Sequence, residues 1–210
     1  MRTLVIETAT AACSVALIEG GRVIANAHEV VGRGHAERLI PMIGALPDEG
    51  RADSILVDVG PGSFTGVRVG LAAAIGLSIG WGVEVRGYSS LALIATAAFA
   101  ADPARASLAV VLEGGHGEVF MQVFHASPFG AQAPLVSMLP AAALEALAGL
   151  PAIGSGVGRL AALAPDHPLA EAWPNAMDAI LLGPDFATLP PSPIYGRAPD
   201  AKTLAERGLA

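Results

Sequence analysis

A glycine-rich segment between an apolar run and a helical pattern constrains this chain more than any other feature. Residues 54–59 are apolar and β-branched, which is typical of a buried strand, and residues 65–80 repeat apolar positions at helical spacing. The glycines of the segment are Gly60, Gly62, Gly66 and Gly70. The sequence therefore predicts a strand, a loop and a helix in direct succession.

This loop has two interpretations. Backbone N–H groups at a helix N-terminus bind anions, which would make Gly60, Gly62 and Ser63 phosphate contacts. The spacing is that of neither a Walker A loop nor the dinucleotide fingerprint, and Pro61 removes one donor. Alternatively, the glycines allow the helix to pack closely on a sheet or on another helix. Both interpretations stay open.

Composition excludes a disordered chain and disfavours a protein that binds nucleic acid by itself. Hydrophobic residues make up 53% of the 210 residues, enough for a sizeable core. The net charge is −7, whereas binding to phosphates needs clustered Lys and Arg. The single cysteine, Cys13, excludes an intramolecular disulfide and suits a reducing cytoplasm. The N-terminus lacks the pattern of a signal peptide. The uncharged stretches 69–83 and 87–101 are shorter than the roughly 20 residues of a membrane span. We therefore expect a soluble, cytoplasmic protein without a membrane partner.

The order of elements predicts two α/β lobes. Strands are expected at residues 2–7, 14–19, 22–30, 54–59, 83–86, 107–112, 118–125 and 152–153, and helices at 34–46, 65–80, 89–101, 141–150, 157–164 and 175–182. The pattern of a hairpin followed by helices starts again at residue 107. We therefore predict a first lobe over residues 1–104, a second lobe over 105–189, and an extended tail, 190–210, that packs back on the body.

The first hairpin carries a second candidate site. Glu7, Thr8 and Thr10 follow the first strand, and a carboxylate leading into a Thr-rich turn resembles the Asp-x-Gly-Thr pattern of actin-like and sugar-kinase-like ATPases. Ala9 replaces the glycine that permits close approach to phosphate, and a plain hairpin explains the residues equally well. The five histidines show no metal-ligand spacing, so we predict no metal site, and no motif supports nucleophilic catalysis.

Three motifs together resemble the bacterial TsaB (YeaZ) family. They are residues 4–17, which include Glu7-Thr8-Ala9-Thr10, residues 35–43, and the glycine segment 60–70. Residues 113–120 and 193–197 resemble the family more weakly. The resemblance implies a two-lobed fold of the actin-like ATPase (ASKHA) type, in which each lobe is a mixed sheet with helices.

The resemblance also implies a function. It predicts a noncatalytic subunit required for forming threonylcarbamoyladenosine beside the anticodon of tRNA. The implied partners are the catalytic, metal-carrying paralogue TsaD and the ATPase TsaE, with tRNA contacted only through the complex. No cofactor of its own is implied, a nucleotide being possible only at the interface with the paralogue. A nucleotide-binding ATPase or phosphotransfer enzyme of the same fold is the alternative, and a metallopeptidase, an old label for relatives of this fold, is the third hypothesis.

The resemblance places the partner surface on the two helices of the first lobe. We expect a homodimer in isolation that the paralogue displaces, because one helical surface would serve both. The predicted interface residues are His35, Leu39, Met42, Ile43, Leu46, Gly66, Gly70 and Ala73. Both helices also need a face for their own core, so the sequence leaves the face available to a partner undecided.

Overall fold

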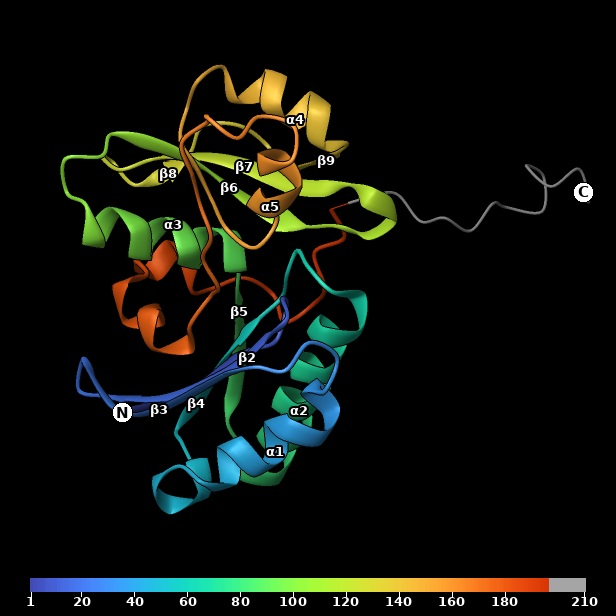
Figure 1. Cartoon of the computed structure of the whole chain (residues 1–210). Helices are drawn as coiled ribbons and strands as arrows, with labels where there is room; N and C mark the ends of the chain where they lie inside the picture. Colours follow the sequence, from blue (N-terminus) through green and yellow to red (C-terminus); the bar gives the residue numbers. More distant parts are fainter. Residues whose placement is uncertain (197–210) are drawn as a thin grey trace, which may run out of the picture.

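Two mixed β-sheets organise the chain, one in each half of the sequence (Figure 1). The computed structural model describes residues 1–196. In the first sheet the strand order is β3-β2-β1-β4-β5, with antiparallel pairs on the β3 side of β1 and parallel pairs on the β5 side. Its strands are β1 (Arg2–Glu7), β2 (Ala12–Glu19), β3 (Arg22–Val30), β4 (Ser54–Asp58) and β5 (Glu84–Tyr88).

The second sheet has the order β11-β10-β6-β7-β8, and β9 also pairs with β7. Its centre is the antiparallel hairpin of β6 and β7, while β10 and β11 add in parallel. Its strands are β6 (Ser107–Glu113), β7 (Val119–His125), β8 (Gly130–Ala131), β9 (Val136–Met138), β10 (Ala152–Ile153) and β11 (Leu169–Ala170). The predicted α/β fold with two mixed sheets is therefore confirmed.

Helices form three layers around the two sheets (Figure 1). The first layer, α1 (His35–Gly44) and α2 (Phe64–Trp81), covers the outer face of the first sheet. Between the sheets lie α3 (Ser90–Ala101) and the 3₁₀ helix η3 (Ala176–Leu181). On the far face of the second sheet lie α4 (Pro140–Leu147) and α5 (Val157–Ala161). Three short 3₁₀ turns complete the described chain, η1 (Pro47–Gly50), η2 (Gly115–Gly117) and η4 (Pro184–Phe186).

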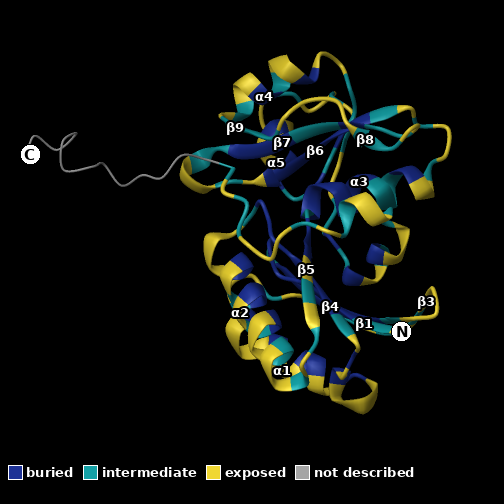
Figure 2. Ribbon diagram, turned by 180° about the vertical axis from the view of Figure 1, so that it is seen from behind, coloured by how far each residue is buried: buried dark blue, intermediate teal, exposed yellow. Residues whose placement is uncertain are grey.

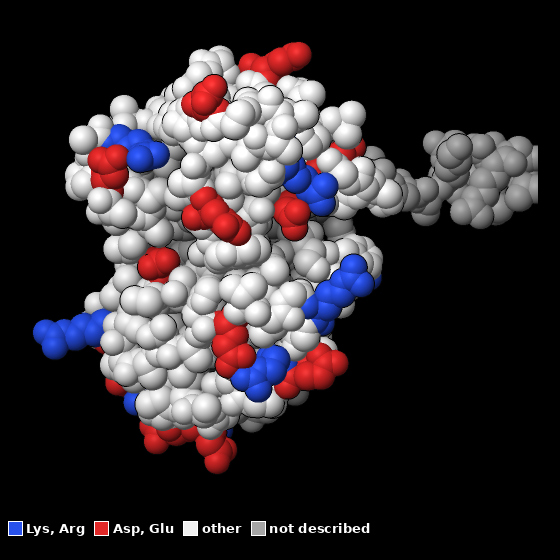
Figure 3. Space-filling model, viewed as in Figure 1, with Lys and Arg blue, Asp and Glu red and all other residues white. Residues whose placement is uncertain are grey.

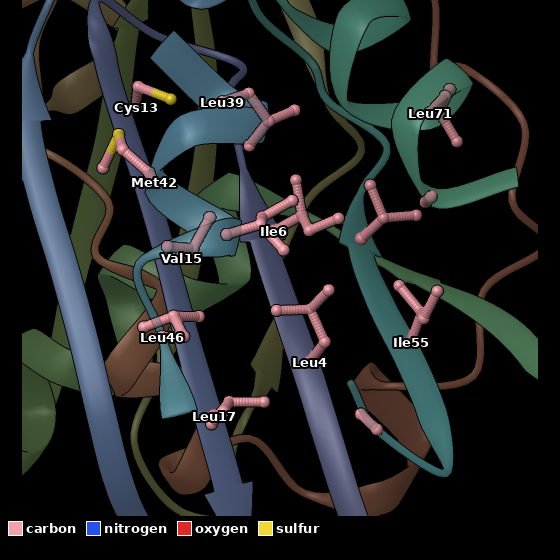
Figure 4. Packing of buried hydrophobic residues seen from close by; sticks show 14 of the residues in the cluster. Leu4, Ile6, Cys13, Val15, Leu17, Leu39, Met42, Leu46, Ile55 and Leu71 are labelled. Atoms are coloured by element: carbon pink, nitrogen blue, oxygen red, sulfur yellow. The ribbon is translucent and has the colours of Figure 1, made fainter. Parts of the chain in front are cut away.

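In the first lobe, successive side chains along a strand point to opposite faces of the sheet, and each face has its own core. In β1, Leu4 and Ile6 belong to the cluster under α1 and α2, whereas Val5 belongs to the cluster under η3. Figure 4 shows Leu39 and Met42 of α1 above these strands. Because both faces of the sheet are covered, β1 and β4 read as nearly continuous apolar runs rather than as alternating ones.

Several predicted elements end earlier or differ in type. The helix expected over 141–150 ends at Leu147, because Ala148 and Gly149 adopt left-handed backbone conformations. The helix expected over 175–182 is the 3₁₀ helix η3, and α5 ends at Ala161. At the start of α3 the Ser89 side chain makes no cap hydrogen bond, and the Asp58 carboxylate accepts the Ser90 N–H at 3.0 Å instead.

The described part of the tail crosses from the first lobe to the second. Leu189 forms a bridge with Gly87 on β5, and the Ile194 N–H donates to the Val59 carbonyl at 2.7 Å. Gly196 then lies against the ring of Phe120 in the second sheet. Residues 197–210 of the predicted tail lie outside the described residues.

By length and composition alone, α2 is the one helix in the described chain that could also cross a membrane. Core helices of ordinary globular domains meet the same criterion. In this fold the inner side of α2 packs on β4 and β1 through Val67, Leu71 and Ala74. Its apolar character is therefore partly explained by packing within the lobe.

Candidate functional site

The glycine segment packs directly on the first hairpin. A Cβ atom at Gly62 would overlap the carbonyl oxygen of Ala9, and one at Gly66 would overlap the carbonyl oxygen of Thr8. A Cβ atom at Gly70 would overlap the Thr8 hydroxyl. These glycines are therefore required for the approach of α2 to the turn between β1 and β2, as the packing interpretation of the loop predicts.

The polar groups of the loop and the hairpin are bonded to each other. The Ser63 N–H donates to the Ala9 carbonyl at 2.6 Å, and the Thr8 hydroxyl donates to the Gly66 carbonyl at 2.8 Å. Ser63 also caps α2 by accepting the Gly66 N–H at 3.2 Å. The Ser63 N–H and the Thr8 hydroxyl, two groups that could bind a phosphate, are thus engaged within the protein, which favours packing at these two positions.

The remaining positions of the two loops are also turned inward. Glu7 accepts the Ala9 N–H at 2.9 Å, and Thr10 accepts the Ala12 N–H at 3.2 Å. Gly60 donates its N–H to Asp58 at 3.0 Å. The structure therefore brings the predicted phosphate-loop positions to one end of the first sheet, where Gly62 and Ser63 also line a cleft.

Beneath these loops lies a buried row of acidic and phenolic groups that the sequence interpretation missed in part. Glu7, Asp58 and Tyr88 are neighbours across β1, β4 and β5, and all three are fully buried. The Tyr88 hydroxyl donates to Glu7 at 3.0 Å, and within residues 1–196 Asp58 Oδ2 has no hydrogen-bond partner. An aspartate that ends an apolar strand just before a glycine loop was the available signal.

Burial controls the protonation of this row. Loss of hydration raises the pKa of Glu7 to about 7, against hydrogen bonds from Ala9 and Tyr88 that lower it. Burial, together with the nearby charge of Glu7, raises the pKa of Asp58 well above its usual range. Both carboxyl groups therefore retain protons to a higher pH than exposed ones would, which limits repulsion between them.

A cleft of about 450 Å³ opens between the two lobes beside the start of α2. Phe64, Val67 and Arg68 of α2 form one side, and Glu113 and Phe120 of the second lobe form the other. The tail residue Tyr195 lines it as well. No group of three or more His, Cys, Asp and Glu side chains suited to a metal ion occurs among residues 1–196.

The predicted partner residues lie mainly in the protein's own core, so that prediction chose the wrong face of the helices. Leu39, Met42, Ile43 and Leu46 are buried in the cluster under α1, and Gly66 and Gly70 are buried against Thr8, while Ala73 is half-buried. His35 is only 4% exposed, and its Nε2 lies 3.1 Å from the Ala12 carbonyl oxygen. The physical reason is that an apolar helical stripe is satisfied first by the sheet of its own lobe.

The opposite sides of α1 and α2 are exposed (Figure 2). On α2 the exposed residues that follow Arg68 are uncharged and have helical spacing: Ala72, Ile75, Gly76, Ile79 and Gly80. Ile79 is 78% exposed, and on α1 Ile40 is 53% exposed. We call the five α2 residues together with Ile40 the outer helix face.

Comparison with known proteins gives the family. A family model described as "TsaD: tRNA N6-adenosine threonylcarbamoyltransferase" matches residues 22–127, half of the chain. The chain belongs to this family. The match begins at β3 and ends just after β7, so it includes the glycine segment, the outer helix face and the central hairpin of the second sheet.

Among relatives, TsaB (YeaZ) members of the family are similar over about half of the chain. The Escherichia coli protein named "tRNA threonylcarbamoyladenosine biosynthesis protein TsaB" is 40% identical over 126 residues, 57% of this chain and 53% of the relative. The Haemophilus influenzae protein of the same name is 42% identical over 101 residues, 46% of this chain and 42% of the relative. The chain thus spans about half the length of the curated relatives that it matches.

A solved structure extends the similarity to both lobes. "YeaZ from Pseudomonas aeruginosa" superposes with a TM-score of 0.74 at 27% identity, covering 92% of this chain and 99% of that one. The resemblance to the TsaB (YeaZ) family and the two-lobed ASKHA-type fold that it implies are both confirmed.

Proposed function

We propose that this chain is the noncatalytic scaffold subunit that acts with TsaD and TsaE in threonylcarbamoyl transfer to the adenosine beside the anticodon of tRNA. The support from comparison is that its TsaB relatives carry the name of this biosynthetic pathway. In this proposal TsaD is the catalytic chain, and tRNA is contacted through the complex because a net charge of −7 disfavours binding by this chain alone. The assembly acts in the cytoplasm, where tRNA is modified.

The outer helix face is the observation that carries the proposal. Apolar residues at spacing i, i+3, i+4 and i+7 on an exposed helix side are typical of a helix that packs on another helix. Gly76 and Gly80 have open space where a Cβ atom would lie, so a partner helix could approach the backbone closely. An exposed uncharged face of this kind is typical of a protein interaction site.

The same face would serve a second copy and the TsaD paralogue in turn. A homodimer of this chain would bury Ile40, Ile75 and Ile79 by a two-fold arrangement of identical helix pairs. A paralogue of the same fold would offer an equivalent helix pair, and would displace the second copy if it packs better. Assigning catalysis to the paralogue is supported by the hydrogen bonds that engage the Ser63 N–H and the Thr8 hydroxyl within this chain.

Light scattering on a sizing column tests this proposal. The protein is measured alone and then mixed with TsaD from the same organism, as wild type and as Ile79→Arg. We expect a homodimer that converts to a one-to-one heterodimer, and loss of both assemblies in the variant because a charge would be buried at the interface. Leu163→Arg is the matched control, since Leu163 is 58% exposed and belongs to the second lobe.

Two results would contradict the scaffold proposal. One is a wild-type protein that stays unchanged on mixing with TsaD. The other is an Ile79→Arg variant that assembles as well as Leu163→Arg does.

A nucleotide-binding ATPase is a second candidate because of the cleft between the lobes. Calorimetry with ATP and magnesium on the isolated protein distinguishes the two. The scaffold proposal expects no binding at micromolar concentrations without TsaD, with any nucleotide held only at the interface with the paralogue.

A further inference from the structure

Building on the proposed function, we propose that Arg68 docks a carboxylate of the partner subunit while an apolar partner side chain enters the cleft beside it. The outer helix face by itself is uncharged and gives packing without a specific polar contact. Arg68 would supply that contact at the N-terminal end of the same helix.

The Arg68 side chain is held in place before any partner arrives. Its guanidinium carbon lies 3.5 Å from the centre of the Phe64 ring, and its Nη2 donates to the Tyr195 hydroxyl at 3.1 Å. Stacking covers one face of the planar group and leaves its edges available. A guanidinium has five N–H donors in a fixed fork that fits a carboxylate with two parallel hydrogen bonds.

Arg68 also lacks the carboxylate partner that five of the nine arginines within residues 1–196 have. Arg2, Arg38, Arg86, Arg105 and Arg159 each form an ion pair with a carboxylate. Within residues 1–196 no carboxylate lies within 4 Å of Arg68. Glu113, the one acidic residue among the described residues that line the cleft, is bonded to Arg159 at 3.2 Å. The cation at the cleft is therefore free to pair with an incoming anion.

The surroundings of Arg68 have the composition of an interaction hot spot. Phe64 and Tyr195 are each 59% exposed, which is unusual for aromatic rings in a lobe with a well-filled core. Their ring centres lie 6.4 Å apart, and both line the cleft together with the buried side chains of Val67 and Phe120. Arginine and aromatic side chains beside an apolar pocket are typical of the interface positions at which truncation of a side chain to alanine weakens protein association.

Continuity with the outer helix face identifies the occupant as the partner subunit. Arg68 precedes Ala72 by one helical turn on the exposed side of α2, so a chain that covers Ala72, Ile75 and Ile79 extends onto Arg68. A second copy would present the same cation and the same cleft. Neither feature is complementary to an identical copy of itself. A different chain with a projecting acidic residue next to an apolar one fits both features.

On the face shown in Figure 3, positive and negative side chains are scattered rather than gathered in a basic patch. Such a surface suits a contact with one carboxylate better than binding to a polyanion.

The test is calorimetric titration of the full chain with TsaD from the same organism at two salt concentrations. We expect Arg68→Gln to weaken the complex about 10- to 100-fold and to reduce its salt dependence, because a charged hydrogen-bonded pair is lost. Arg68→Lys should recover part of the affinity, since it restores the charge without the fork. Arg22→Gln is the matched control, because Arg22 is exposed at the turn between β2 and β3.

The outcomes separate this proposal from the one on which it depends. If Ile79→Arg abolishes the complex while Arg68→Gln binds like Arg22→Gln, the scaffold function stands and the docking role of Arg68 is overturned. If neither variant affects binding, both proposals fail. Micromolar binding of ATP to the isolated protein that is lost in Arg68→Gln would also overturn it, by assigning the site to a small anion. If Arg68→Gln weakens the homodimer and the heterodimer equally, Arg68 contacts a second copy as well as TsaD. That result would overturn the proposal that Arg68 contacts only a different chain.

Discussion

On the inner side of α2, Gly66 and Gly70 lie against Thr8, whereas on the outer side Gly76 and Gly80 face open space. The two pairs belong to one helix and are spaced alike in the sequence. The inner pair is needed because the carbonyl and hydroxyl oxygens of Thr8 occupy the volume of a side chain, whereas within the described residues nothing lies within 4 Å of a Cβ atom placed on either outer glycine. Small residues in a helix therefore indicate that another segment approaches the helix backbone closely. They do not indicate whether that segment belongs to the same chain or to a partner.

The largest expected effect separates the two sides of α1. Leu39→Ala removes a fully buried side chain above β1 and should cost about 3 to 4 kcal/mol of unfolding free energy, through lost burial and the cavity left behind. Ile40→Ala, on the exposed side of the same helix, should change stability by less than about 0.5 kcal/mol. Urea unfolding of both variants measures this. Similar losses in the two would mean that the assignment of inner and outer sides is wrong.

The buried acid row beneath the inner side gives the next effect. Burial raises the pKa of Glu7 from an ordinary 4.5 to about 7, so the folded protein holds a proton that the unfolded chain has already released in this range. Stability should therefore fall as pH rises from 4.5 to 7, by about 3 kcal/mol from Glu7 alone. The raised pKa of Asp58 adds a loss of the same sign.

Unfolding by urea at a series of pH values measures this slope. Glu7→Gln cannot lose a proton and should flatten it. Glu37→Gln is the matched control, because Glu37 is exposed on α1, and it should keep the slope of the wild type. A slope that is the same in Glu7→Gln as in the wild type would contradict the raised pKa of Glu7.

The third prediction addresses the glycines directly. Gly66→Ala places a methyl group on the Thr8 carbonyl oxygen and should destabilise the protein by about 2 kcal/mol or more, because backbone has to move. Gly76→Ala has open space and should stabilise α2 by about 0.5 to 1 kcal/mol, as alanine does within a helix. The same Gly76→Ala variant should weaken association with a partner that packs on the outer helix face. Thermal unfolding and light scattering give the two readouts, and a stable Gly66→Ala variant would contradict the close packing.

How far the sequence could predict the molecule follows from the same comparison. Strands such as β4 and helices such as α2 were predictable because their apolar periods and the glycine loop between them leave little alternative. The outer helix face was not predictable, because both sides of α2 are apolar and only the position of the sheet separates Leu71 from Ile75. The loops were ambiguous for another reason: their N–H groups suit a phosphate as well as they suit Ala9, and only the approach of the hairpin decides between the two. The role of Asp58 as the acceptor at the start of α3 depends on a contact between residues 32 positions apart, which no local pattern contains.

The smallest expected effect compares two serines on α2. Ser63 accepts the Gly66 N–H as the N-cap, so Ser63→Ala should cost about 1 kcal/mol by leaving that donor without its side-chain partner. Ser78 lies inside the helix and donates to the Ile75 carbonyl, a bond that competes with the helical pattern, so Ser78→Ala should be neutral or slightly stabilising. Urea unfolding of the pair distinguishes them, with the wild type as reference. Because the cap fixes the start of α2 where the loop meets the first hairpin, Ser63→Ala should also loosen that contact, which hydrogen exchange of the Ser63 N–H would report. An unchanged exchange rate together with an unchanged stability would mean that the packing of Gly62 and Gly66 alone positions the helix, and that the cap is dispensable.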